Sequence, residues 1–132
     1  MQRPPPTLGI RHLALQVTDL AACRQFYVDL LGMHIEWEPD PENVYLSSGS
    51  DNLALHQAKL KFDPAADQRL DHLGILVQSP ERVDEWYEFL CAHHVEIVKP
   101  PKTHRDGARS FYCRDPAGNT VQMIYHPPIS KT

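Results

Sequence analysis

Two stretches of the chain alternate between aliphatic and polar residues, and each leads into an apolar pattern of helical period. Residues 12–17 alternate strictly, with three aliphatic side chains on one side and His12 opening the other. The alternation returns over 72–77, where His72 stands in the place of His12. A period of two predicts strands with one buried face, so both histidines are expected opposite the aliphatic face.

A helix is predicted after each alternating stretch. Thr18-Asp19 is a capping signal, and the apolar residues after it repeat at helical spacing until Gly32, a typical C-terminal cap. Ser79-Pro80 opens the second helix, with proline at the first helical position. Each half therefore begins with a strand followed by a helix.

Short strands are predicted to complete each half. In the first half they cover 33–37, 44–47 and 53–57, with a loop at 39–42. In the second half they cover 95–97, 110–113 and 120–125, with a loop at 100–107. The order in each half is strand, helix and three strands, which indicates an α+β fold.

The two halves form an internal repeat. A shift of about sixty positions superimposes His12 on His72 and brings strand, helix and second strand into register. We expect one domain, residues 1–132, built from module one (about 9–57), a linker (58–70) and module two (71–127).

Candidate ligands follow from this alternation. His12 and His72 lie opposite the aliphatic face, and on the closing strands the same test selects Ala54, His56 and Gln122. If both sheets surround one cavity, His12, His72 and Gln122 converge with His56 nearby, a nitrogen and oxygen set for a divalent ion. The alternative for each is a half-buried polar residue. The remaining histidines, among them His93, His94, His104 and His126, are interpreted as structural or exposed.

Composition narrows the chemistry. Eight histidines against three cysteines favour imidazole over thiolate ligands, and the cysteines show no CxxC spacing. The net charge of −4, without basic runs, argues against nucleic acid and membrane-surface partners. Reduced thiols without a signal peptide or an apolar span predict a cytoplasmic protein.

The chain resembles the vicinal oxygen chelate superfamily over residues about 9–127. The resemblance is carried by segments 12–17, 26–32 and 71–75, and above all by 111–122, which contain the turn Asp-Pro-Ala-Gly-Asn. This superfamily includes glyoxalase I, fosfomycin and bleomycin resistance proteins, methylmalonyl-CoA epimerase and extradiol dioxygenases. The resemblance implies two βαβββ modules that form a half-open, mostly antiparallel barrel around a central cavity, and a homodimer.

The resemblance also implies a metal site. Its ligands fall on His12, His72 and Gln122, where the superfamily most often has glutamate in place of Gln122. The remaining position falls on Ala54 or His56. Two imidazoles and one amide carry no charge, so we expect weaker metal binding, or an anionic substrate or a water completing the shell.

Two functions follow as hypotheses. The first is a metal-dependent enzyme of lyase, isomerase or dioxygenase type, in which a divalent ion (Zn, Ni, Fe or Mn) polarises neighbouring oxygens of a small substrate, with His56 as ligand or general base. The missing glutamate argues against glyoxalase I, epimerase and fosfomycin-transferase chemistry, and against the dioxygenase triad. The second is a metal-free small-molecule binding protein of the bleomycin-resistance type, with Trp37, Tyr45 or Trp86 as stacking groups.

Overall fold

The structure, a computed structural model, describes residues 4, 10–63 and 70–130. The chain divides into two compact units, residues 1–61 and 62–132, and this boundary falls inside the predicted linker. Residue 9 and the linker residues 64–69 lie outside the described residues. We keep the names first and second module for the two units.

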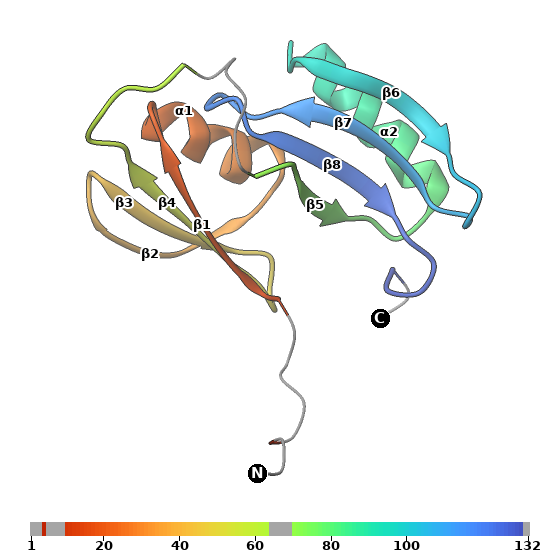
Figure 1. Cartoon of the computed structure of the whole chain (residues 1–132), viewed down its shortest axis with the longest axis horizontal. Coiled ribbons are helices and arrows are strands. Elements are labelled where there is room, and N and C mark those ends of the chain that lie inside the picture. Colours follow the sequence, from red (N-terminus) through yellow and green to blue (C-terminus); the bar gives the residue numbers. More distant parts are fainter. Residues whose placement is uncertain (1–3, 5–9, 64–69, 131–132) are drawn as a thin grey trace. The chain divides into compact units, whose positions relative to one another are not determined.

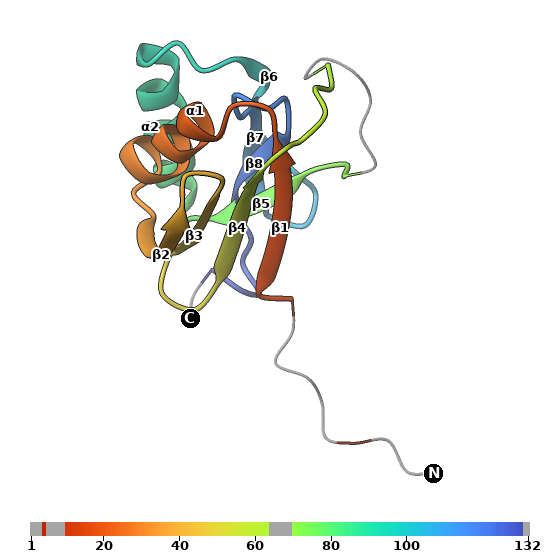
Figure 2. The ribbon, with the colours of Figure 1, turned by 90° about the vertical axis from the view of Figure 1, so that its left-hand side faces the viewer.

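The first module is built on a four-stranded sheet. Its strands follow the order β1-β4-β3-β2, with β1 and β4 parallel and the other pairs antiparallel. Figure 2 shows β1 and β4 side by side. The strands are β1 (His12–Val17), β2 (His34–Asp40), β3 (Asn43–Ser47) and β4 (Asn52–Gln57).

The second module repeats this topology. Its order is β5-β8-β7-β6, again with one parallel and two antiparallel pairs (Figure 1). The strands are β5 (Leu73–Leu76), β6 (Ile97–Thr103), β7 (Arg109–Arg114) and β8 (Thr120–Tyr125). Two open, mostly antiparallel sheets with few helices confirm the α+β class.

The helices begin where the capping signals predict. Asp19 caps α1 (Leu20–Arg24) by accepting from the Ala22 amide, and Ser79 caps α2 (Pro80–Ala92). The first helix continues as a π-helical segment, η1 (Gln25–Leu30), which the apolar spacing did not predict.

Each helix packs against the aliphatic face of its own sheet. In the first module the residues buried on the aliphatic face of the sheet are Leu15, Val17, Val44, Leu46, Leu53 and Leu55, and the buried helix residues include Cys23, Phe26 and Tyr27. In the second module Tyr87 of α2 meets Phe111 of β7 edge to face, with centroids 5.4 Å apart. The predicted orientation of the strand faces is therefore confirmed, and His12 and His72 lie on the faces opposite the helices.

Two loop predictions were wrong. β2 continues through Pro39 to Asp40, so the turn there is confined to 41–42. β6 begins at Ile97, not at 95, and continues through both prolines to Thr103. Both strands lie at a sheet edge, and their prolines fall where the pairing register shifts, between Trp37 and Asp40 in β2 and between Lys99 and Lys102 in β6.

Candidate functional site

The face of the first sheet that carries His12 also carries His56, and we call it the histidine face. Strand register places its side chains in rows across β1 and β4. The pairs are His12 with Asn52, Ala14 with Ala54, and Gln16 with His56. His12 and His56 thus lie on one face, separated by a row of two alanines.

His12 is held by a relay that ends in a carboxylate. Its Nδ1 lies 2.7 Å from Asn52 Oδ1, and Asn52 Nδ2 donates to Glu36 Oε2 over 2.7 Å. A carboxylate only accepts hydrogen bonds, so the Asn52 NH₂ group must face Glu36 and its oxygen must face the ring. Nδ1 of neutral His12 therefore carries the proton, and Nε2 presents a lone pair.

His56 is held in the same way by different residues. Its Nδ1 lies 2.6 Å from Asn43 Oδ1, while Asn43 Nδ2 donates to both oxygens of Asp40 over 2.9 and 3.1 Å. The same donor logic places the proton of neutral His56 on Nδ1 and the lone pair on Nε2. Neither the asparagines nor the carboxylates were found from the sequence, because they meet the histidines only through cross-strand register.

In the second module a carboxylate contacts His72 directly, with no asparagine between them. Its Nδ1 lies 2.5 Å from Asp71 Oδ1, and its ring meets Tyr112 edge to face with centroids 5.6 Å apart. The carboxylate again selects the tautomer with the proton on Nδ1. The His72 side chain is 37% exposed, so this histidine is only half-buried on its face of the sheet.

Gln122 lies on the same face of the second sheet, opposite Gly74 and Tyr112. It is 9% exposed, and its Nε2 donates to Ser110 Oγ over 3.1 Å. Ser110 Oγ also lies 3.1 Å from His104 Nε2, so this histidine supports Gln122 indirectly. With the amide nitrogen engaged, the carbonyl oxygen is the atom of Gln122 that can bind a cation.

Strand register also compares the closing strands of the two modules. Ala54 lies opposite Ala14, and Gln122 lies opposite Gly74, the residue sixty positions after Ala14. Ala54 is therefore the counterpart of Gln122, and His56 lies two residues further along the same face.

A β-bulge turns Trp37 onto the histidine face. Ile35 pairs with Leu46 of the core, but Trp37 pairs with Tyr45, so β2 advances two residues where β3 advances one. Trp37 stacks on Tyr45 with centroids 5.1 Å apart and planes at 23°. In a regular strand of the same sequence, Trp37 would lie opposite Val44 and share the core face with Ile35.

The second module has the same bulge with different chemistry. Ile97 pairs with Cys113 and Lys99 with Tyr112, and Lys99 Nζ lies 5.7 Å from the Tyr112 ring centroid. An ammonium group therefore takes the place of the indole of Trp37 over the equivalent tyrosine.

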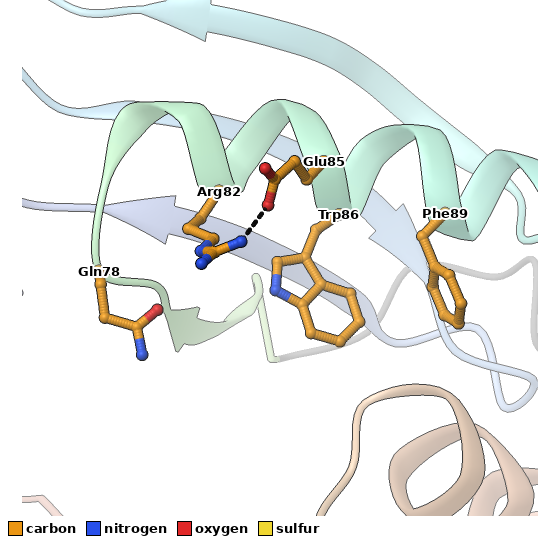
Figure 3. Close-up of a pocket in the computed structure, with 5 residues that line it drawn as sticks. All are labelled: Gln78, Arg82, Glu85, Trp86 and Phe89. Atoms are coloured by element: carbon orange, nitrogen blue, oxygen red, sulfur yellow. Dashed lines mark hydrogen bonds and ion pairs between the residues drawn. The ribbon is translucent and has the colours of Figure 1, made fainter.

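Trp86, the third aromatic residue predicted as a stacking group, lies elsewhere. Figure 3 shows it in a pocket along α2, with Phe89, Gln78 and the ion pair of Arg82 and Glu85. Because α2 covers the aliphatic face of its sheet, this pocket lies on the side of the module opposite His72 and Gln122.

The buried thiol of Cys113 carries no chemistry at this site. Burial, followed by the nearby charge of Asp115, raises the pKa of Cys113 to about 12, so the thiol stays protonated at neutral pH. Within the residues that the structure describes, no three side chains of His, Cys, Asp or Glu gather as a metal site. Of the predicted ligands, His12 lies in the first module, and His72 and Gln122 lie in the second.

Comparison with known proteins identifies the family. Residues 9–123 match the model of the glyoxalase/bleomycin resistance protein/dioxygenase superfamily. The chain belongs to this superfamily. Among its curated relatives, metallothiol transferase FosB of Staphylococcus saprophyticus is 26% identical over 115 residues, which cover 87% of this chain and 75% of the relative. Virulence protein STM3117 of Salmonella typhimurium is 27% identical over 121 residues, covering 86% of this chain and 81% of that protein.

Solved structures of the glyoxalase superfamily share the fold over nearly the whole chain. Lactoylglutathione lyase from Agrobacterium tumefaciens aligns with a TM-score of 0.75 and 25% identity, covering 92% of this chain and 96% of that one. A glyoxalase/dioxygenase from Nostoc punctiforme aligns with a TM-score of 0.79 at 23% identity, covering 96% of this chain and 97% of that one.

No helix among the described residues has the length and apolarity needed to span a membrane.

Proposed function

We propose that this chain is a metal-dependent enzyme that binds a small substrate through two neighbouring oxygens. In this proposal His12, His72 and Gln122 hold one divalent cation. The observation that carries it is the oxygen acceptor beside Nδ1 of both histidines, which favours the tautomer that leaves a lone pair on Nε2. Metal-binding histidines commonly have such a partner on the second nitrogen.

The donor set fits a cation of intermediate softness. Two imidazole nitrogens and an amide oxygen suit Zn, Ni, Fe or Mn. When bound, such a cation acts as a Lewis acid on the substrate oxygens. The ligands are neutral, but carboxylates support both histidines. Asp71 contacts His72 directly, and Glu36 contacts His12 through Asn52. Water or an anionic substrate would complete the shell.

His56 is proposed as the general base. Its Nε2 accepts a proton while Nδ1 keeps its hydrogen bond to Asn43, and Asp40 holds that amide in place. Ala54, rather than His56, is the counterpart of Gln122, which supports the role of base over that of ligand.

The relatives support metal-linked chemistry without fixing the reaction. The names metallothiol transferase and lactoylglutathione lyase describe transfer and lyase reactions, and the proposal extends to this chain only the class of a metal-dependent enzyme acting on a small molecule. We also propose a homodimer, with the ligand set completed within one chain or between two.

Metal uptake tests the proposal. Untagged protein, stripped with a chelator and reconstituted with each candidate metal, is expected to retain stoichiometric metal after desalting. His12→Ala and His72→Ala should lose it, whereas His34→Ala should keep it, because His34 lies on the same face of the first sheet but at its far edge strand. Equal retention in all three variants, or none in the unaltered protein, would contradict the proposal.

One observation favours a second function, small-molecule binding without a metal. Trp37 is 59% exposed on the histidine face, and such a large aromatic surface stacked on Tyr45 is suited to holding a ligand ring. Calorimetric titration of metal-free and metal-loaded protein with the same compound distinguishes the two functions. Equal affinity in the two forms supports this alternative.

A further inference from the structure

We propose that the histidine face of the first module binds a planar ring that bears an N–H or O–H donor, held between the Trp37–Tyr45 stack and His56. The inference deepens the proposed function, because it names the class of substrate for that face. It rests on side chains of the first module only.

The first observation is the exposed aromatic stack. Trp37 is 59% exposed while one part of its ring system already stacks on Tyr45 at 5.1 Å. The β-bulge between Ile35 and Trp37 interrupts the regular pairing of β2 with β3 and directs the indole away from the core. Bulges recur beside functional sites because they redirect side chains in this way.

The second observation is a row of small residues beside the stack. Tyr45 lies opposite Ala54, which is 1% exposed, and Ala54 lies opposite Ala14, whose exposed methyl group ends the row. His12 and His56 border the row on either side. They are four residues apart in register, a rise of about 13 Å along the strands. A ring with a substituent at each end matches that span.

The third observation is the direction of hydrogen bonding at His56. The Asn43–Asp40 relay leaves Nε2 as an acceptor, so a neutral His56 can pair only with a donor at that atom. The His56 ring also meets Tyr45 edge to face, with centroids 5.8 Å apart, so acceptor and aromatic surface belong to one contact group. The ligand must therefore combine a flat ring with a donor.

The second module provides an internal contrast. The counterpart of Trp37 is Lys99, which places an ammonium group over Tyr112. A neutral planar ring gains less from that surface than from an indole. Ring binding is accordingly expected on the first module, and in an NMR titration the signals that shift should belong to residues of that module.

Three probe compounds test separately whether binding needs a planar ring and whether it needs a hydrogen-bond donor. Phenol is planar and donates, anisole is planar without a donor, and cyclohexanol donates without a planar ring. In NMR titrations of chelator-treated protein we expect phenol to bind tightest and to shift the Trp37 indole and His56 ring signals. The loss of one hydrogen bond predicts anisole about threefold to tenfold weaker.

Variants assign the two contacts. Trp37→Leu should weaken both aromatic probes, and Trp86→Leu, which alters the other tryptophan, should leave them unchanged. His56→Phe should remove the preference for phenol over anisole and leave anisole binding intact. Dispersed amide spectra confirm folding of each variant.

A measurement on the unaltered protein does not depend on variants folding. The ¹⁵N chemical shifts of the His56 ring should report the proton on Nδ1. A proton on Nε2, equal binding of phenol and anisole, or unchanged phenol binding by Trp37→Leu would each overturn the inference. Because the protein is metal-free throughout, these outcomes are independent of whether the proposed metal site binds an ion.

Discussion

Ala54 and Gln122 occupy the same position in the two modules. Each lies on the closing strand directly opposite a small residue of the opening strand, Ala14 in one case and Gly74 in the other. The repeat is therefore symmetric in backbone and asymmetric in chemistry, since one closing strand offers an amide oxygen and the other a methyl group. Metal binding should accordingly respond to substitutions around Gln122 more than to substitutions around Ala54.

Gln122→Glu is expected to tighten metal binding by about tenfold or more. A unit negative charge 4 Å from a divalent cation contributes about 8 kcal/mol at an effective dielectric of 20, and desolvation of the carboxylate offsets much of this gain. Competition against a metallochromic chelator measures the change. Gln16→Glu, which adds the same charge near His56, should alter affinity much less, and an equal effect would mean that charge alone is responsible.

Asn52→Ala is expected to weaken metal binding by about 10-fold to 100-fold, because His12 loses the acceptor that fixes its tautomer. Asn52→Asp keeps an acceptor at that atom and should restore most of the affinity. Asn43→Ala removes the same group from His56 and should leave metal affinity nearly unchanged. A comparable loss in Asn43→Ala would instead identify His56 as a ligand.

Gly32→Ala should destabilise the protein by about 1–2 kcal/mol. Gly32 has φ of +79°, and a methyl group added there would point into open space, so the cost is backbone strain without a clash. Gly74→Ala would meet only Ile124 Cγ2 at 3.8 Å, an ordinary contact, and should be close to neutral. Urea unfolding of both variants checks the contrast, and similar losses in the two would refute the assignment to strain.

Stability should fall at alkaline pH as Cys113 ionises. Its pKa is about 12 in the folded protein and near 9.0 when solvated, so the folded state holds this proton more tightly. The contribution is fully present below pH 9 and is lost as the pH rises towards 12. Between pH 8 and 11 the urea midpoint should fall less steeply with pH in Cys113→Ala than in the unaltered protein. Equal pH dependence of the two midpoints would count against ionisation of Cys113 as the cause.

Thiol labelling gives a separate test of the same burial. At pH 8 the exposed Cys91 should react with a thiol reagent in the native protein, and Cys113 should react only after unfolding. Mass spectrometry of labelled peptides identifies the reacting residue. Rapid labelling of Cys113 in native protein would show that its burial is not maintained.

Sequence patterns predicted what depends on local periodicity. Alternation placed His12 and His72 opposite the aliphatic faces, and the capping residues Asp19 and Ser79 marked both helix starts. The edge strands were cut short in prediction because prolines normally end strands, a rule that edges relax.

The supporting residues could not be predicted in the same way. Asn52 and Glu36 reach His12 only because β4 pairs with β1 and the side chain of Glu36 extends from β2 to Asn52. Such contacts depend on register between strands distant in sequence, which periodicity does not encode. His104 was interpreted as a loop residue, and its link to Gln122 through Ser110 depends on tertiary structure.

The bulge between Ile35 and Trp37 reverses which later residues of β2 face the histidines. A regular strand of the same sequence would place Glu36 opposite Tyr45 and turn Trp37 to the side of Leu46 and Val44. Loss of one residue between Ile35 and Trp37 would restore a regular ladder and still leave Trp37 opposite Tyr45. The bulge therefore gives one strand two neighbouring contacts on the same face, because Glu36 reaches Asn52 while Trp37 stacks on Tyr45.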